Sequence, residues 1–289
     1  MTQVARPRLP AFFPYIGGKW RIAPKIIALF PVHTCYVEVF GGSGSVLFAK
    51  ERSHMECLND IDSEVVNFFR VMSDPELSEA LQQRLLFTPY SRELFEELVD
   101  MDPPTDPLEK AWRFYTIACQ CFGGYRPANE GREFAGATRG RWRRSLSKRH
   151  SQGGDAATIH SKISRMDRFS ERLRGVYIEK KDFTYIFQSW DSPETLFYCD
   201  PPYHGTEGYY DNGHFPATRH VDLANALNAI EGKAILSYYP HADLEQLYPA
   251  GTWRRVEVQA MRNSHKTGRG SPKKKVTELL LCNFPEASA

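Results

Sequence analysis

The stretch "CYVEVFGGSGSVLFAKERSHMECLND", residues 35–60, decides the fold. It opens on an apolar run at 35–40 that is typical of a buried strand. A glycine-rich loop at 41–45 follows, then a helical run at 46–51 and a second apolar strand that ends at Asp60. Strand, glycine loop, helix and strand in this order form the βαβ unit of nucleotide-binding α/β proteins. The stretch therefore predicts an α/β fold with a nucleotide-like ligand at the loop.

The same alternation of strands and helices returns later in the chain. We expect further strands at 176–179, 196–199, 233–239, 254–261 and 276–284. Apolar spacing at a period of 3.6 predicts helices at 20–31, 62–72, 75–86, 92–101, 108–122, 158–175, 221–231 and 242–248. This pattern predicts one discontinuous domain, residues 1–72 and 158–289, with an open sheet and helices on both faces. A mostly helical insertion, 73–157, interrupts it.

The composition narrows the class of protein. The 289 residues are 42% hydrophobic and 25% charged, and the formal net charge is only +2. The six cysteines form no C-x-x-C pair, so neither a zinc ribbon nor another metal site is expected. The sequence shows no signal-peptide pattern and no apolar run long enough to cross a bilayer. We therefore expect a reduced, cytoplasmic protein without a metal or a membrane partner.

The strand at 196–199 runs directly into Asp200, Pro201, Pro202 and Tyr203. Two prolines can continue neither a sheet ladder nor a helix interior, so the strand must end at a rigid turn. That turn carries a carboxylate and an aromatic ring. A solvated turn explains the four residues as well as an active site does, so the rest of the chain has to decide.

The loop at 40–44, "FGGSG", contains glycines that let the backbone approach a ligand and turn tightly into a helix. Asp60, at the end of the next strand, is placed to accept both ribose hydroxyls of an adenosine-type ligand. The chain lacks the six-residue dinucleotide fingerprint, and no Gly-Lys-Ser/Thr follows the loop. These absences favour a nucleoside cofactor without a phosphate chain.

Lys19 lies in "YIGGKW", residues 15–20, immediately before the first predicted helix. A lysine at a helix start opposes the helix dipole. One explanation is a ligand carboxylate held by Lys19 and nearby backbone N–H groups. A solvated lysine in a glycine turn is the simpler explanation of this motif taken alone.

Two segments concentrate positive charge and favour contact with a nucleic-acid backbone. One is residues 262–275, which contain no acidic residue and end in Lys273, Lys274 and Lys275. The other is residues 126–149, within the predicted insertion. Its basic residues, opposed only by Glu130 and Glu133, are Arg126, Arg132, Arg139, Arg141, Arg143, Arg144, Lys148 and Arg149.

Together these motifs resemble the Dam-like DNA adenine-N6 methyltransferases. "YIGGK" is similar to that family's N-terminal cofactor motif, "FGGSG" to its F-x-G-x-G loop, "NDID" to its acidic strand end and "DPPY" to its catalytic tetrapeptide. The terminal "KKKVTELLLCNF" resembles its last hairpin strand. The motifs stand in the family's order, and the likeness covers nearly the whole chain outside the arginine-rich insertion.

The resemblance implies a methyltransferase fold of the S-adenosylmethionine-dependent, Rossmann-like type, with the insertion as a target-recognition domain. It also implies S-adenosylmethionine as cofactor, double-stranded DNA as partner, a target adenine flipped out of the duplex, a bacterial or phage origin and a monomer or weak dimer. The implied catalytic residues are Asp200, Pro201, Pro202 and Tyr203. The implied cofactor-binding residues are Tyr15, Gly17, Gly18, Lys19, Glu38, Phe40, Gly42, Gly44, Asp60, Asp182, Phe183 and Asp200.

The chemistry of the turn agrees with this resemblance. An exocyclic amine is a poor nucleophile because its lone pair is delocalised into the ring, so the lone pair must be aimed at the methyl group. Asp200 offers an ionised acceptor for the amine, and the carbonyl of Pro201 offers a backbone acceptor. Tyr203 offers a face for the extruded base.

Three alternatives remain open at the level of the sequence. Cytosine-N4 methylation uses the same geometry, so only the resemblance favours adenine. A DNA-binding regulator without catalysis should have lost "DPPY", the glycine loop or Asp60, and all three are intact. An RNA or protein methyltransferase fits two basic loops less well. The segment "GREFAGATRGRWRR" only partly resembles the one with which Dam-like enzymes read GATC, so no recognition sequence is predicted.

Overall fold

The computed structural model describes residues 9, 11–125, 142–144, 154–203, 215–261 and 275–286. Its strands form one sheet in the order β3-β2-β1-β4-β5-β7-β6. Strands β1 to β5 pair in parallel, and β7 runs antiparallel to both β5 and β6. Their bounds are β1 Cys35–Glu38, β2 Met55–Asn59, β3 Tyr177–Glu179, β4 Thr195–Cys199, β5 Lys233–Tyr238, β6 Arg254–Met261 and β7 Lys275–Cys282. The predicted α/β class is confirmed, and the mixed sheet is consistent with a methyltransferase fold.

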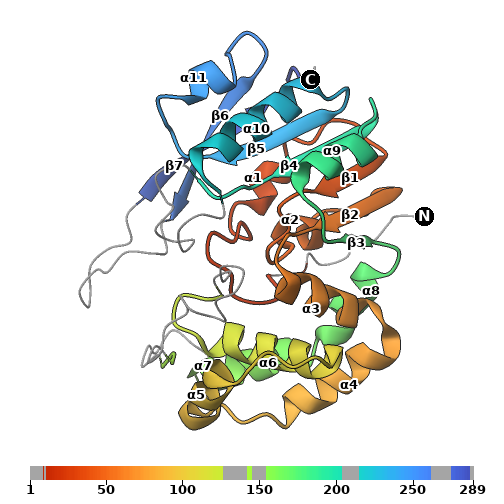
Figure 1. Cartoon of the computed structure of the whole chain (residues 1–289), viewed down its shortest axis with the longest axis vertical. Helices are drawn as coiled ribbons and strands as arrows, with labels where there is room; N and C mark the ends of the chain where they lie inside the picture. The colour runs from red at the N-terminus through yellow and green to blue at the C-terminus, as the bar shows by residue number, and fades with distance from the viewer. Residues whose placement is uncertain are drawn as a thin grey trace.

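Helices lie on both faces of this sheet, as Figure 1 shows. Their bounds are α1 Ala23–Ile27, α2 Ser45–Ala49, α3 Ser63–Ser73, α4 Pro75–Leu86, α5 Arg92–Asp100, α6 Pro107–Gln120, α7 Gly154–Ile163, α8 Met166–Leu173, α9 Phe183–Trp190, α10 Ala217–Ala229 and α11 Leu244–Leu247. No helix in these described ranges is long and apolar enough to cross a membrane.

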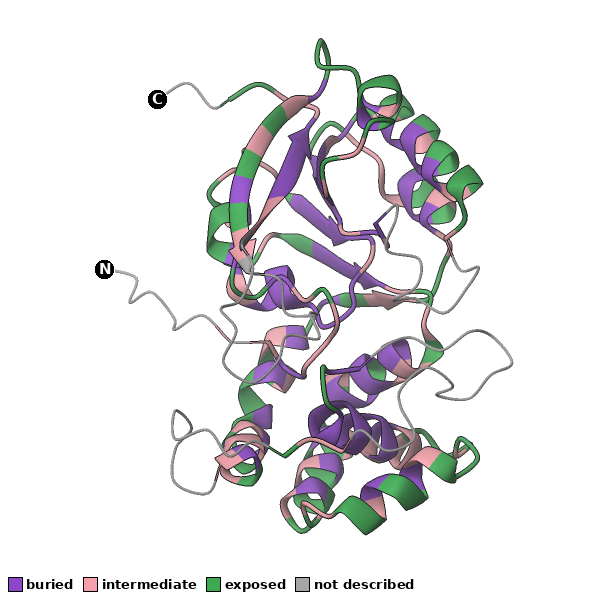
Figure 2. Ribbon diagram, turned by 90° about the vertical axis from the view of Figure 1, so that its left-hand side faces the viewer, coloured by how far each residue is buried: buried purple, intermediate pink, exposed green. Residues whose placement is uncertain are grey.

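Strand alternation divides the interior into two cores. In β4, Leu196 and Tyr198 join the core beneath α1, α2, α3 and α8, whereas Phe197 and Cys199 join the core beneath α9, α10 and α11. Successive side chains of a strand point to opposite faces, so a strand buried on both sides is apolar throughout. Figure 2 shows several strands buried along their whole length, as the burial of β1 and β4 requires, whereas others carry exposed and half-buried residues.

A helical part lies at the lower end of Figure 1, where α4, α5, α6 and α7 gather. Helix α3 packs against α4, α6 and α8, and α4 also packs against α7 and α8. The core of this part is continuous with one face of the sheet. The division at residues 73 and 157 stays a prediction.

Two predicted helices differ from those observed. The helix expected over 20–31 is limited to Ala23–Ile27, with Pro24 in its first turn. Leu29 and Phe30 then bond to the third residue back, and Pro31 disfavours helical geometry at the residue before it. The helix expected over 158–175 is two helices, α7 and α8, with a break at 164–165.

Helix α9 is a third difference, because no helix was predicted over Phe183–Trp190. Its sequence, "FTYIFQSW", is rich in aromatic and β-branched residues that favour strands. The side chain of Asp182 accepts a hydrogen bond from the backbone N–H of Thr184 and so caps the helix. Burial of Phe183, Ile186 and Phe187 against the sheet overrides the intrinsic preference.

Candidate active site

The predicted site residues come from the carboxyl ends of four adjacent parallel strands. The glycine loop follows β1, Asp60 follows β2, Asp182 lies beyond β3, and Asp200 follows β4. Strand β1 lies between β2 and β4, so the connections leave it in opposite directions. Ligands of open α/β sheets bind at such a switch point. The fold therefore gathers these residues at the edge where a ligand is expected.

The glycine loop has a backbone that only glycine adopts easily. Gly42 has φ +48° and Gly44 has φ +63°, both in the left-handed region. A methyl group placed on Gly42 would lie 2.9 Å from the ring of Tyr15, and one on Gly44 would lie 2.8 Å from the ring of Phe48. The two glycines are therefore required by conformation and by space, and Tyr15 lies directly against the loop.

Asp60 ties the glycine loop to the start of α3. One oxygen accepts the N–H of Gly42 at 2.7 Å, and the other accepts the N–H of Asp62 at 2.9 Å. Burial, with the nearby charge of Asp62, raises the pKa of Asp60 to about 6, against the opposing effect of these bonds. These two bonds hold the carboxylate of Asp60 beside the glycine loop.

Glu38, at the end of β1, is buried beneath the same loop. Its Oε2 accepts the backbone N–H of Leu47 at 2.8 Å and the hydroxyl of Tyr36 at 3.0 Å. Burial raises the pKa of Glu38 to about 7, so the carboxyl is close to half protonated at neutral pH. These contacts face α2, and the predicted contact of Glu38 with a cofactor stays a prediction.

The 15–19 turn lies against the glycine loop. Gly17 has φ +76°, and a methyl group on Gly18 would lie 3.2 Å from the carbonyl oxygen of Tyr15 and 3.6 Å from the hydroxyl of Ser43. The turn closes with a bond from the N–H of Gly18 to the carbonyl of Tyr15 at 3.1 Å. The 15–19 turn and the glycine loop, which are separate in the sequence, thus lie side by side, and Lys19 is at the end of this turn.

Lys19 reaches the predicted catalytic tetrapeptide. Its ammonium donates to Oδ2 of Asp200 at 2.7 Å and to the carbonyl of Gly17 at 2.9 Å, and it lies 3.3 Å from Oε1 of Glu278. The hydroxyl of Tyr203 lies 2.9 Å from Oδ1 of Asp200 and 2.6 Å from Oε1 of Glu278. We call Lys19, Asp200, Tyr203 and Glu278 the carboxylate cluster.

Burial and opposing charges set the protonation of Asp200. Burial raises its pKa above the usual value, Lys19 lowers it and Glu278 raises it. The side chain of Asp200 is 19% exposed, whereas those of Lys19 and Glu278 are 8% and 5% exposed. Asp200 is therefore the more accessible of the two carboxylates in this cluster, and its contact with a substrate stays a prediction.

The other residues of the tetrapeptide are packed tightly. Pro201 is buried and Pro202 half-buried. The ring of Tyr203 lies 4.5 Å from the ring of Tyr239 and 5.4 Å from that of Tyr238, and the ammonium of Lys19 lies 5.0 Å from its centroid. Only 8% of Tyr203 is exposed. The ring must therefore turn outward before it can stack on a base.

Phe40 and Phe183 contribute to an aromatic group beside the loop. Their rings lie 5.8 Å apart, and Phe215 lies 5.8 Å from Phe40 and 5.9 Å from Phe183. The guanidinium of Arg219 lies 4.2 Å from the Phe183 ring centroid and donates to Asp182. Burial opposes, but the bonds from Thr184 and the charge of Arg219 outweigh it and lower the pKa of Asp182.

Most of the predicted DNA-binding residues lie outside the described residues, namely Arg126, Arg132, Arg139, Arg141, Lys273 and Lys274, together with the side chain of Lys275. Arg143 is described, and its guanidinium lies 2.8 Å from the carboxylate of Asp155. Its carbonyl accepts the hydroxyl of Tyr90 at 2.5 Å. Arg143 thus anchors the end of its segment to α7, and its contact with DNA stays a prediction.

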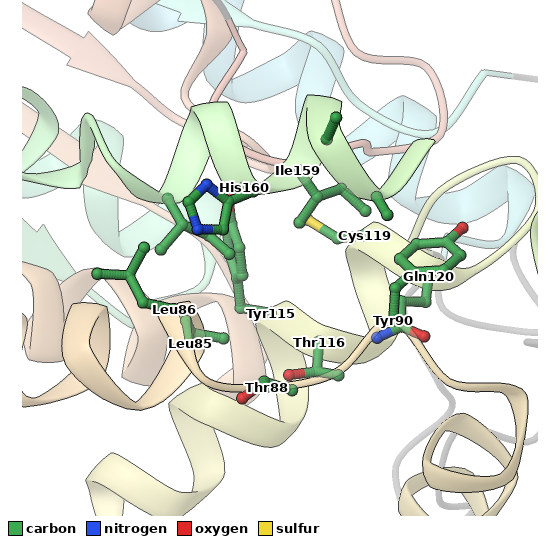
Figure 3. Close-up of a pocket in the computed structure, with 13 residues that line it drawn as sticks. Leu85, Leu86, Thr88, Tyr90, Tyr115, Thr116, Cys119, Gln120, Ile159 and His160 are labelled. Atoms are coloured by element: carbon green, nitrogen blue, oxygen red, sulfur yellow. The ribbon is translucent and has the colours of Figure 1, made fainter. Parts of the chain in front are cut away.

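A cavity of about 320 Å³ lies elsewhere, between α4, α6 and α7 (Figure 3). Its lining is largely apolar, and the 13 described residues around it include none of the predicted site residues. Within the described residues, no three His, Cys, Asp or Glu side chains group as metal ligands. The absence of a metal stays a prediction.

Comparison with known proteins decides the family. The family model of the D12 class N6 adenine-specific DNA methyltransferases matches residues 15–264, which cover the glycine loop, Asp60 and the tetrapeptide. The chain belongs to this family. The D12 class methyltransferase is thus an enzyme that acts on DNA, and adenine N6 is the atom methylated, as the motifs predicted.

Individual relatives are distant. The D12 chain is 21% identical to the type II methyltransferase M.CviBI of Paramecium bursaria Chlorella virus NC1A, over 86% of this chain and 89% of that protein. It is 24% identical to the type II methyltransferase M1.LlaDCHI of Lactococcus lactis subsp. cremoris, over 98% and 99%. It is 23% identical to the DNA N-6-adenine-methyltransferase of Escherichia phage P1, over 71% of this chain but 26% of that protein.

Two residues of the D12 chain's site were not predicted from the sequence. Glu278 lies in β7 directly before the apolar run Leu279, Leu280 and Leu281, and a buried charged residue in such a strand is a signal that could have identified it. Arg219 lies in the first turn of α10, and no local pattern links it to Asp182. Only the fold brings either residue to the site.

Proposed function

We propose that this D12 class enzyme transfers the methyl group of S-adenosylmethionine to adenine N6 in double-stranded DNA, with Asp200 at the reacting amine and the adenine flipped out of the helix. The main support is the placement of Asp200. It is the partly accessible carboxylate of a buried, charged cluster, and it lies beside a glycine loop at the switch point of the sheet.

The residues around the loop fit such a cofactor. Gly42 and Gly44 take left-handed backbone conformations, so the loop turns tightly from β1 into α2 beside the carboxyl end of the strand. Asp60 provides a carboxylate beside the loop for the ribose hydroxyls. Phe40 and Phe183 provide apolar rings for the adenine, with Asp182 next to them as an acceptor for its amine. When bound, S-adenosylmethionine supplies an electrophilic methyl group on a positively charged sulfur.

Asp200 and Pro201 then orient the target amine. Oδ1 of Asp200 accepts one N–H and the carbonyl of Pro201 accepts the other, which aims the nitrogen lone pair away from the base plane. As the new N–C bond forms, the methyl–sulfur bond would break and its electron pair would stay on the sulfur, which leaves as a neutral thioether; the amine would lose one proton, which Asp200 is placed to receive. The ammonium of Lys19 donates to Oδ2 of Asp200. Its positive charge favours the ionised form of Asp200 and so opposes the rise in pKa that burial causes.

The remaining predicted residues have proposed roles in stacking on the flipped base and in binding DNA. Tyr203 turns outward to stack on the flipped adenine. The lysines at 273–275 hold the phosphate backbone, and the arginines of the 126–149 segment, whose planar forks suit guanine edges, read the sequence.

Product analysis tests the proposal. The purified enzyme is incubated with methyl-labelled S-adenosylmethionine and unmethylated duplex DNA, which is then digested to nucleosides. We expect the label in N6-methyl-2′-deoxyadenosine. Label in N4-methyl-2′-deoxycytidine would contradict the assigned base, and label on single-stranded but not duplex DNA would contradict the assigned partner.

A further inference from the structure

We propose that Glu278 is a positioning residue for methyl transfer, because it engages the hydroxyl of Tyr203 and thereby leaves Oδ1 of Asp200 to accept the target amine. This inference rests on the proposed role of Asp200. Neither the family motif nor the sequence pattern assigns a role to Glu278.

The hydrogen-bond geometry limits what Tyr203 can do. Its hydroxyl has one proton and lies within reach of two carboxylate oxygens, Oε1 of Glu278 at 2.6 Å and Oδ1 of Asp200 at 2.9 Å. A single proton makes one strong bond at a time. While it points to Glu278, the shorter contact, Oδ1 of Asp200 keeps its lone pairs for another donor.

Lys19 accounts for the other oxygen of Asp200. The ammonium has three N–H groups, and Oδ2 of Asp200, the carbonyl of Gly17 and Oε1 of Glu278 all lie around it. Lys19 thus fixes the orientation of the Asp200 carboxylate through Oδ2. The amine N–H of a flipped base is the matching donor for Oδ1.

The position of Glu278 in the sheet supports a function. It lies on β7, and β5 separates β7 from the strand that carries Asp200. The neighbours Leu279, Leu280 and Leu281 are buried and apolar. A second buried carboxylate beside Asp200 adds repulsion that an apolar residue would avoid, so packing alone gives no reason for an acid at this position.

The cluster also gives the inference a pH signature. The negative charge of Glu278 raises the pKa of Asp200. Without that charge, and with the Tyr203 hydroxyl released to Asp200, the carboxylate of Asp200 ionises at lower pH. The titratable groups that act on Asp200 are Lys19, Glu278, Tyr203, Glu38, Tyr198 and Cys199.

The test uses single-turnover transfer of labelled methyl to DNA from a strain that lacks adenine methylation. In Glu278→Gln, the neutral amide competes poorly for the hydroxyl, which moves to Oδ1 of Asp200. We expect transfer at least tenfold slower, cofactor affinity within twofold of wild type, and an acid limb of the rate profile moved to lower pH. The control is Glu257→Gln, an exposed acid on the adjacent strand β6, which should match wild type.

A second substitution separates positioning from structural support. Adding Tyr203→Phe to Glu278→Gln removes the hydroxyl that occupies Oδ1, so the double variant should transfer methyl at least threefold faster than Glu278→Gln alone. A double variant that is equally slow or slower, or a Glu278→Gln protein with wild-type rates, would overturn the inference. Asp200→Asn distinguishes the two proposals: if that variant is active, the site itself is wrong, whereas if it is inactive while Glu278→Gln is normal, only the role of Glu278 is wrong.

Discussion

Asp200, Asp60, Glu38 and Glu278 lie near one edge of the sheet, but their surroundings differ. Asp200 contacts a lysine, Asp60 accepts backbone N–H groups, and Glu38 accepts one backbone N–H and a phenol. Burial raises the pKa of the first three, and their partners oppose it to different extents. Carboxyl groups whose pKa values differ at one site can take different roles in binding and catalysis.

Glu38 should be replaceable by its neutral isostere. Because its pKa is about 7 when folded, above the ordinary value of 4.5, the folded protein binds the extra proton between those values. Wild type should lose about 2 kcal/mol of unfolding free energy between pH 5 and pH 8 relative to Glu38→Gln. Urea unfolding across this range measures the difference, and parallel pH dependences would contradict it.

Glu38→Ala serves as the comparison, because it leaves the N–H of Leu47 and the hydroxyl of Tyr36 without their acceptor. It should lower the unfolding free energy by about 1–3 kcal/mol at pH 7. Equal stability of the glutamine and alanine variants would show that these two bonds contribute little.

Asp60 should make cofactor binding depend on pH. Its pKa is raised to about 6, so the ionised form that accepts ribose hydroxyls most strongly predominates above pH 6 and is lost below it. The dissociation constant for S-adenosylmethionine, measured by calorimetry, should rise by up to about tenfold per pH unit below 6. In Asp60→Asn this dependence should vanish and affinity at pH 8 should be lower. An unchanged profile would remove Asp60 from the cofactor site.

At the scale of elements, regular helices with clear start signals were predictable and those decided by tertiary contacts were not. Helix α4 was predicted at its observed bounds, because Asp74 caps it and Pro75 opens it. Asp62 caps α3 in the same way. Helix α9 could not be predicted, because its strand-favouring residues form a helix only when three of them pack on the sheet.

Asp182 has two roles at the start of α9 that substitution can separate. Asp182→Asn keeps an oxygen to cap the helix, whereas Asp182→Ala should lower the unfolding free energy by about 0.5–2 kcal/mol. If the carboxylate also accepts the amine of the cofactor's adenine, both variants should bind S-adenosylmethionine more weakly. Thermal unfolding and calorimetry measure the two effects. Full cofactor affinity in both variants would leave Asp182 as a helix cap alone.

At the scale of the whole molecule, the sequence predicted the alternating α/β order and the motifs at the strand ends. The contacts of Lys19 with Asp200 and Glu278 were not predictable, because the three residues come from distant segments that meet only after the sheet has formed. A ligand carboxylate was one explanation for Lys19 and a solvated lysine the simpler one, whereas in the folded chain a carboxylate of the chain itself lies next to it.

The two basic segments should contribute differently to DNA binding. Replacing Lys273, Lys274 and Lys275 with alanine should weaken binding to all duplexes alike. The slope of the logarithm of the binding constant against the logarithm of salt concentration should become shallower by about one for each phosphate that is no longer neutralised. Replacing Arg126, Arg132, Arg139 or Arg141 singly should relax specificity at one base pair, by about 1–3 kcal/mol. Binding to cognate and single-mismatch duplexes across a salt series measures both. A lysine variant that changes the preferred sequence, with arginine variants that do not, would reverse the roles.

The central claim is that methyl transfer takes place at Asp200. Base-resolution methylation mapping of DNA from methylation-deficient cells that express wild type or Asp200→Asn tests it most directly, with cofactor binding by the purified variant as the control for folding. We predict N6-methyladenine at a defined sequence with wild type, and at least a hundredfold less with a variant that still binds S-adenosylmethionine. Wild-type levels of N6-methyladenine with Asp200→Asn would contradict the account.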